Sequence, residues 1–362
     1  MKKLLALLLV LSLLAVCSGC LAEAESPAAD APLPEWEIGM LDDGTAEILR
    51  YNGTQANPAV PAEIDGVRIT AVGNSAFAGC DFLTDVTLPE GIVRVGDRAF
   101  EECAALTGIT VPVSVTDVGM NPFARCASLK DIRLAQDHPA LELRNGVLYG
   151  KQDARLISYP CASEEIDFVI PDGVRVIGGM AFFRCENLIT VSIPASVTRI
   201  DPYAFCECTA LSGIVIPDGV TEIPDRAFSV CVSLNTAVLP PSVTRIGNWA
   251  FFACLTLADI SIPENVTEIG YYAFSHCAGL TNVRIPEKME KIGACAFSYC
   301  ENLLEINLPA SISFIGFEAF DHCYHENRSD PDLSTKVLIT VAAGSYAEEY
   351  CRSDKQLSYE SR

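Results

Sequence analysis

The motif Phe-x-x-Cys recurs along most of the chain at a fixed interval, and this interval constrains the fold more than any other feature. The phenylalanines of the motif fall at positions 77, 100, 123, 182, 205, 228, 251, 274, 297 and 320. Every interval is 23 residues except the 59 residues between Phe123 and Phe182. That interval fits two repeats plus an insertion of 13 residues, with Tyr159 in place of the missing phenylalanine. The chain therefore carries about eleven repeats.

Each repeat contains a strand pattern and a turn pattern. In "LTNVRIP" (280–286), Val283 and Ile285 alternate with Arg284, which indicates a strand with one buried face. The spacing Ala-Phe-x-x-Cys predicts one helical or 3₁₀ turn. A unit of this length buries about eight side chains and has no core of its own, so the repeats must stack on one another. The sequence predicts a solenoid whose coils lie roughly 4.8 Å apart.

The unit L-x-x-I-x-I-P-x-x-V-T-x-I-G-x-x-A-F-x-x-C resembles the BspA-like subclass of leucine-rich repeats, found on bacterial and some protist surfaces. The resemblance implies an α/β repeat solenoid of about eleven coils, with a parallel β-sheet on one face and short helical turns on the other. It divides the chain into a capping hairpin at 36–60, repeats at 61–325 with a hairpin insertion around 135–165, and a C-terminal cap at 326–362.

The N-terminus is typical of an export signal. Lys2 and Lys3 precede an apolar run over 4–16, which is too short to span a bilayer. Residues 17–20 resemble a bacterial lipobox, which predicts a signal peptide at 1–19, lipidation of Cys20 and a tether at 20–35. Cleavage after Ala24, which would give a secreted protein, is the alternative. Both predict export, and the favoured one places the protein on the bacterial cell surface with a lipid anchor.

The composition is strongly acidic, with a formal net charge of −22. Such a charge excludes nucleic acid and anionic lipid as expected partners. Contact with a membrane is expected only through the N-terminal lipid.

Ten cysteines occupy one register position, and they are Cys80, Cys103, Cys126, Cys185, Cys208, Cys231, Cys254, Cys277, Cys300 and Cys323. A straight ladder of parallel side chains does not converge on a tetrahedral zinc ion. Disulfides between neighbouring coils have the right span, but parallel Cβ directions oppose the required torsion. We expect the ladder to be structural packing. Five cysteines of the expected mature chain lie outside the ladder, and they are Cys20, Cys161, Cys206, Cys295 and Cys351. They are expected to be unpaired thiols, with a regulated bond as the alternative.

The sequence contains no nucleophile elbow, phosphate-binding glycine loop, HExxH motif or EF-hand loop. The segment "HCYH" (322–325) contains metal-ligating residue types, but no second cluster of ligands accompanies it to complete a coordination shell. The chain is therefore predicted not to be an enzyme, with no cofactor and no metal site. Two surfaces are candidates for partner binding. Arg133 and Arg284 lie at outward positions of the expected sheet, while Trp249, Phe252 and Tyr272 flank the Phe turns of consecutive coils. Ordinary solvation of the sheet and packing of these rings are the alternatives.

The resemblance implies a non-catalytic adhesion scaffold that recognises protein or glycan ligands on a host or neighbouring cell. A structural component of the cell envelope that assembles with copies of itself is the alternative. The sequence leaves the ligand, the face used and the oligomeric state open.

Overall fold

The computed structural model describes residues 33–325, 335–354 and 357–362. Residues 36–362 form one compact unit. The predicted signal peptide at 1–19, the lipidation of Cys20 and most of the tether at 20–35 lie outside the described residues. Within the described part, no helix is long and apolar enough to cross a membrane.

Each coil contains two short parallel strands separated by a proline turn. In one coil, β23 (Asn282–Arg284) buries Val283 and β24 (Lys291–Ile292) buries Ile292. The second strand was not foreseen from the sequence. It forms because this part of the backbone also bonds to the preceding coil, as Gly293 N does to Ile269 O at 2.8 Å. The fold is a leucine-rich-repeat solenoid with parallel sheets on two sides of each coil and little helix.

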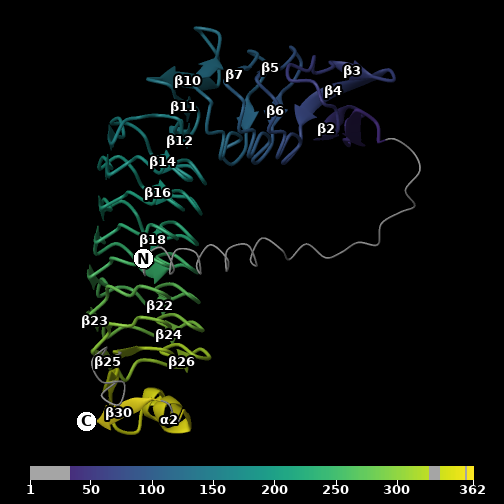
Figure 1. The fold of residues 1–362 in the computed structure, drawn as a ribbon. Helices are drawn as coiled ribbons and strands as arrows, with labels where there is room; N and C mark the ends of the chain where they lie inside the picture. Colours follow the sequence, from purple (N-terminus) through teal and green to yellow (C-terminus); the bar gives the residue numbers. More distant parts are fainter. Residues whose placement is uncertain (1–32, 326–334, 355–356) are drawn as a thin grey trace. The chain divides into compact units, whose positions relative to one another are not determined.

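The first strands of the coils form two sheets, in which the strands of the regular repeats, 23 residues apart, pair in register. They are β5 (Asp85–Thr87), β7 (Gly108–Thr110) and β9 (Asp131–Arg133), and then β13 (Asp167–Val169), β15 (Thr190–Ser192), β17 (Gly213–Val215), β19 (Thr236–Val238), β21 (Asp259–Ser261), β23, β25 (Glu305–Leu308), β29 (Leu338–Val341) and β30 (Ser358–Ser361). The last two strands follow at intervals of 33 and 20 residues. The second strands are β4 (Val67–Val72), β6 (Arg94–Val95), β8 (Asp117–Val118), β14 (Val176–Ile177), β16 (Arg199–Ile200), β18 (Glu222–Ile223), β20 (Arg245–Ile246), β22 (Glu268–Ile269), β24 and β26 (Phe314–Ile315), which lie one above another in Figure 1 from β14 to β26.

The Phe turn closes each coil, and it is not the helical or 3₁₀ turn that the spacing predicted. Two residues per turn, such as Trp249 and Ala253 around Phe251, have left-handed backbone with φ of 51° and 55°. This geometry points alternate N–H groups along the stack. Phe228 N donates to Ala250 O at 2.8 Å, and Phe251 N to Ala273 O at 2.8 Å. The N–H groups between them bond within the turn, as Phe252 N does to Trp249 O at 3.2 Å and Cys254 N to Phe251 O at 3.2 Å. Each turn is therefore bonded both to itself and to the next coil.

The insertion forms a three-stranded meander of β10 (Leu141–Arg144), β11 (Val147–Gly150) and β12 (Arg155–Ser158). It lies between two hydrophobic cores and belongs to both. Leu148 packs in the N-terminal core, while Val147 and Tyr149 pack in the C-terminal core. We call the coils of residues 46–133 the N-terminal stack and those of residues 167–341 the C-terminal stack.

The solenoid has about 13 turns, rather than about eleven, because the outermost turns lack the Phe motif. Tyr51 occupies the first phenylalanine position, with its ring 5.4 Å from that of Phe77. The N-terminal hairpin of β1 (Trp36–Met40) and β2 (Ala46–Tyr51) covers this end, and β3 (Glu63–Ile64) pairs with β4. At the other end lie β27 (Tyr324–His325), β28 (Thr335–Lys336) and α2 (Tyr346–Ser353), the one regular helix of the described residues, which Ser345 caps.

Candidate binding surfaces

A continuous stack of side chains runs along the C-terminal stack at the position two residues before each core phenylalanine. We call Tyr203, Arg226, Trp249 and Tyr272 the aromatic–arginine ladder. The guanidinium carbon of Arg226 lies 5.6 Å from the ring centre of Tyr203 and 4.2 Å from that of Trp249. The rings of Trp249 and Tyr272 stack at 5.6 Å with an interplanar angle of 7°. Two of the predicted aromatic residues are thus in direct contact.

The left-handed backbone at these positions turns the ladder side chains away from the core. All four residues have φ between 51° and 62°, which lifts their side chains out of the core that the phenylalanine fills. Tyr271 adds an edge-on ring 4.3 Å from Trp249 and is itself exposed. Because the backbone of each turn is bonded to the next, side chains at this position are stacked coil upon coil.

Arg226 distinguishes the ladder from the rest of the surface. Among the described residues, no carboxylate lies within 4.0 Å of its guanidinium, although the protein is strongly acidic. Contacts with two rings hold it instead, at about 0.5–2 kcal/mol each. Arg226 was not predicted from the sequence, because aromatic character alone marked the candidates beside the Phe turn. Its register position relative to Phe228 nevertheless matches that of Trp249 relative to Phe251.

Phe252 does not join Trp249 and Tyr272 in one patch. Its side chain is only 9% exposed, and its ring contacts His276 at 5.3 Å on the other flank of the Phe turn. From His276 a second ladder continues through Tyr299 at 4.5 Å to His322 at a further 4.4 Å. Burial, together with repulsion from His322, lowers the pKa of His276 to about 4, so that its ring is neutral at pH 7.

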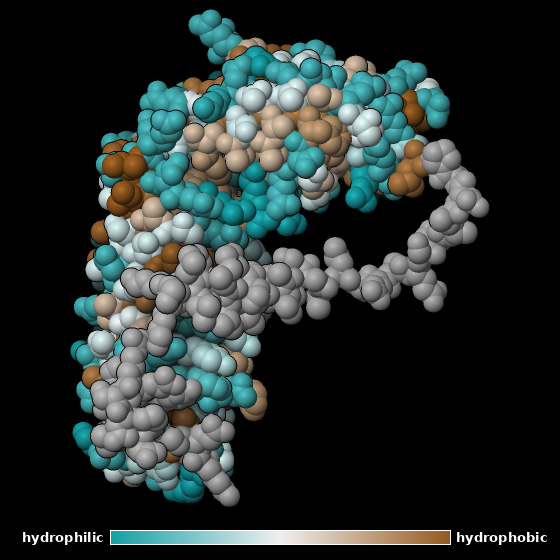
Figure 2. Space-filling model, in the orientation of Figure 1, coloured by the Kyte–Doolittle hydropathy of each residue, from teal (hydrophilic) through white to brown (hydrophobic). Residues whose placement is uncertain are grey.

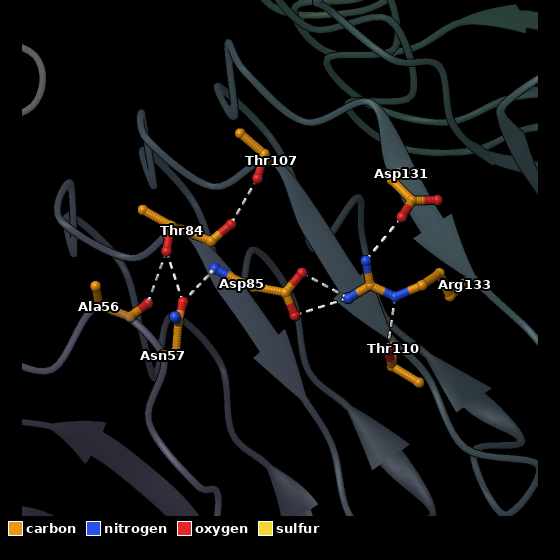
Figure 3. A network of polar contacts seen from close by, with 8 residues as sticks. All are labelled: Ala56, Asn57, Thr84, Asp85, Thr107, Thr110, Asp131 and Arg133. Carbon is orange, nitrogen blue, oxygen red and sulfur yellow. Dashed lines mark hydrogen bonds and ion pairs between the residues drawn. The ribbon is translucent and has the colours of Figure 1, made fainter.

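Arg133 lies on the sheet of the N-terminal stack, where it forms a closed network (Figure 3). Its guanidinium crosses β7 and donates to both carboxylate oxygens of Asp85 at 2.7 Å, and it also donates to Asp131 at 2.7 Å and to Thr110 at 2.8 Å. The bonds to Asp85 and Asp131 raise the pKa of Arg133. Gly108 permits the crossing, since a Cβ there would lie 2.6 Å from the guanidinium. Most of the donors of Arg133 are therefore used within the chain.

The sheet of the C-terminal stack is more open. Val215 and Val238 face outward and are 62% and 55% exposed, and the side chain of Arg284 is 80% exposed with one ion pair, to Glu264 at 3.0 Å. Figure 2 shows brown, apolar surface in small patches along the left edge, the side on which Figure 1 draws β23 and β25. Arg133 and Arg284 lie in different sheets, so they do not act as one site.

Comparison with known proteins identifies the repeat. The model of the BspA type leucine rich repeat region matches residues 66–167, 159–281 and 198–327. The chain belongs to the BspA-type leucine-rich repeat family. A search of curated proteins gave no match.

Two solved structures with TM-scores above 0.5 share the fold of this chain. A leucine-rich repeat protein from Eubacterium ventriosum matches with a TM-score of 0.59 and 21% identity, over 78% of this chain and 91% of that one. The pneumococcal vaccine antigen PcpA matches with a TM-score of 0.53 and 19% identity, over 82% and 72% of the two chains. A leucine rich cell surface protein from Faecalibacterium prausnitzii is 24% identical over 89% and 98%, with a TM-score of 0.43.

The cysteines of this BspA-type repeat lie where they fill the corner after each Phe turn. All ten ladder thiols are buried. Eight of them donate to the carbonyl of the phenylalanine in the preceding coil, as Cys254 does to Phe228 O at 3.2 Å and Cys277 to Phe251 O at 3.1 Å. Burial raises the pKa of these two thiols. They are protonated and unreactive at neutral pH.

A cleft that the sequence did not indicate interrupts the second sheet of the C-terminal stack. It has a volume of about 600 Å³ and lies where β16 and β18 do not pair. Arg199, one of its lining residues, is bound to Asp201 at 2.8 Å. Across the described residues, no three His, Cys, Asp or Glu side chains are grouped to hold a metal ion. The other charged residues of its lining are Asp153, Arg175 and Glu222.

Proposed function

We propose that this BspA-type repeat protein is an exported, non-catalytic scaffold that binds a protein partner through the aromatic–arginine ladder. The observation that carries the proposal is Arg226, held between Tyr203 and Trp249 with no carboxylate within 4.0 Å among the described residues. A preorganised guanidinium loses little entropy when it forms paired hydrogen bonds with an incoming carboxylate. Tryptophan, tyrosine and arginine supply most of the energy in protein interfaces.

The geometry favours a protein over a glycan as the partner. Arg226 and Tyr272 cover the two faces of the Trp249 ring, so the ladder offers ring edges and donors rather than an open aromatic platform. The fitting partner is a segment with a carboxylate next to an apolar side chain. Because this chain is strongly acidic, a partner whose remaining surface is basic or neutral would meet the least repulsion.

The test is binding of the purified chain to an array of matrix proteins and glycans. We expect saturable binding to a protein, with affinity about tenfold or more lower for Arg226→Ala and for Arg226→Lys. Lysine keeps the positive charge but lacks the paired N–H donors with which a guanidinium binds a carboxylate. Arg284→Ala, on the sheet, is the matched control and should bind normally. Loss only in Arg284→Ala would move the site to the sheet, and loss of glycan binding alone would assign a glycan ligand.

The same experiment separates the alternative of self-assembly. If no member of the array binds the chain, and all variants are folded, the binding proposal is contradicted. Association of the chain with itself in analytical ultracentrifugation, dependent on concentration and unaffected by added protein, would then support a structural component of the cell envelope.

We further propose that the protein is anchored to the membrane through a lipid on Cys20. The support is the charged start, the short apolar run and the small residues before Cys20. Palmitate labelling in a bacterial host should mark the chain and be lost in Cys20→Ala. Labelling that persists in Cys20→Ala, or release of an unlabelled chain into the medium, would contradict the anchor.

A further inference from the structure

The ladder of cysteines is interrupted at the insertion. Eight ladder thiols donate to a phenylalanine carbonyl 26 residues earlier in the chain. For Cys185 that residue is Tyr159, and Cys185 instead contacts the thiol of Cys161, with 3.7 Å between the two Sγ atoms. Two free thiols in van der Waals contact therefore occur where the regular hydrogen bond is missing.

The register explains why these two sulfurs approach each other differently from two ladder neighbours. Tyr159 occupies the phenylalanine position of its coil, with its ring 5.2 Å from that of Phe182. Cys161 follows Tyr159 by two residues, whereas Cys185 follows Phe182 by three. The side chains are thus offset by one position and are not parallel copies. The Sγ of Cys161 also bonds to Phe183 O at 3.1 Å, which shows that it reaches toward the next coil.

We propose that Cys161 and Cys185 are an oxidation site that closes to an intramolecular disulfide once the protein has left the reducing cytoplasm. Neighbouring coils lie about 5 Å apart, which is within the span that a disulfide bridges. Only a small movement of the two side chains is needed to bring the sulfurs from contact to bonding distance.

The chemistry needs an oxidant, and a small disulfide such as oxidised glutathione supplies it. The Cys161 thiolate attacks one sulfur of the oxidant, forms a mixed disulfide and releases one thiolate. Cys185 then loses its proton, attacks Cys161 Sγ and releases the second. The two protein thiols lose two electrons and two protons, and the oxidant becomes two thiols. Cys161, which is half-buried, is the entry point, since Cys185 is fully buried.

The electrostatic surroundings support this order. A hydrogen bond with Cys185 lowers the pKa of the Cys161 thiol against the opposing effect of burial, and the charge of Arg184 acts in the same direction as the bond. Burial raises the pKa of Cys185. Cys161 is therefore the thiol that forms the nucleophilic thiolate first.

The bond would connect the insertion to the C-terminal stack. Cys161 follows β12 of the meander, which is the wall shared by the two cores, and Cys185 lies in the first complete coil beyond it. A cross-link at this junction restricts the unfolded chain and opposes separation of the meander from the coil. We expect oxidation to raise the midpoint of thermal unfolding by several degrees.

The experiment uses the purified full chain, reduced and then treated with oxidised glutathione. Remaining thiols are alkylated and the peptides analysed by mass spectrometry. The expected product joins the peptides of Cys161 and Cys185, with the loss of two hydrogen atoms. The thermal midpoint should rise on oxidation in the wild type and in the control Cys295→Ser, another cysteine outside the ladder, but not in Cys161→Ser.

Three results would overturn the proposal. They are full alkylation of Cys161 and Cys185 in the folded, oxidised protein, a cross-link that joins Cys161 to Cys126 instead, and an equal rise of the midpoint in Cys161→Ser. The variant Cys185→Ser is a second way to remove the disulfide, but a buried serine at that position can prevent folding. Cys161→Ser then decides the question, since Cys161 is only half-buried and its substitution disturbs the core less. The inference rests on the proposed export but not on the proposed binding, because neither residue lies in the aromatic–arginine ladder.

Discussion

The N-terminal and C-terminal stacks are built from one repeat, yet they present different surfaces. On the sheet side, Arg133 closes the N-terminal face through Asp85, whereas the C-terminal face leaves Val215 and Arg284 exposed. On the turn side, the ladder position of the C-terminal stack holds three aromatic rings and an arginine in close contact. The same position of the N-terminal stack holds short or singly charged side chains. The occupants in the N-terminal stack are Ser75, Arg98 and Asn121.

The repeat determines which residues form the core, but it does not determine which side chains occupy the outward positions. Phenylalanine, cysteine and the strand aliphatics are buried in both stacks. Since coils lie about 5 Å apart, any side chain placed at the same outward position in successive coils becomes part of a ladder. A solenoid can therefore acquire a binding strip by a few substitutions that do not disturb its core.

The largest expected effect comes from removing a core ring. Phe228 lies between Phe205 and Phe251, with both ring distances at 5.3 Å. Phe228→Ala should lower the free energy of unfolding by about 3–5 kcal/mol, since the cavity cannot collapse between bonded coils. Phe123→Ala should cost less, because Phe123 stacks only on Phe100 among the described residues, at 5.9 Å. Urea unfolding of both variants measures the contrast, and equal losses would contradict it.

The second prediction concerns pH and the ladder that starts at His276. Its folded pKa of about 4 lies below the ordinary 6.5, so the folded state favours the neutral ring. The stability that depends on this ring is complete above pH 6.5 and declines as the pH falls toward 4, by about 1–2 kcal/mol after allowance for its partial exposure. Ser275 bonds to the ring at 2.8 Å, and Asp321 binds the neighbouring His322 at 3.0 Å.

His276→Gln should flatten the dependence of the urea midpoint on pH between 7.5 and 4.5. The corresponding position of the N-terminal stack holds Arg125 paired with Glu102, so Arg125→Gln serves as the comparison and should leave the histidine-dependent slope in place. An unchanged slope in His276→Gln would show that other groups cause it.

The third prediction uses two glycines at the same strand position. A Cβ at Gly108 would meet the guanidinium of Arg133 at 2.6 Å and Asp85 at 2.8 Å, whereas at Gly213 it would meet only Thr236, at 3.0 Å. Gly108→Ala should displace the flexible arginine and cost about 1 kcal/mol through loss of the network. Gly213→Ala should be closer to neutral. Chemical unfolding compares the two, and a larger cost at Gly213 would refute the account of the crossing.

Much of the fold followed from the sequence, because core positions repeat with the coil. The period of 23 residues and the alternation around Arg284 predicted the solenoid and its first sheet. The second sheet and the form of the Phe turn were not predicted, since both depend on backbone bonds to other coils. Left-handed backbone at Trp249 also gives no signal in residue type.

The candidate surfaces were predicted less well, for physical reasons. Aromatic character indicated Trp249 and Tyr272, but it could not show that Phe252 turns inward or that Arg226 completes the stack. Outward positions of the sheet were readable from alternation. Whether an arginine there is bound or exposed depends on what lies two strands away, as Asp85 does from Arg133.

The smallest expected effect is at Arg284, and it sharpens the contrast between the two sheet faces. Arg284→Ala removes one exposed ion pair, so the free energy of unfolding should change by less than about 0.5 kcal/mol. Arg133→Ala should cost about 1 kcal/mol after solvent screening, because it leaves Asp85 and Asp131 close together without their cation. Equal losses in urea unfolding would mean that the network in the N-terminal stack adds nothing. If Arg284→Ala leaves the free energy of unfolding unchanged, any change that it causes in partner binding results from lost contact at that sheet face and not from a weakened fold.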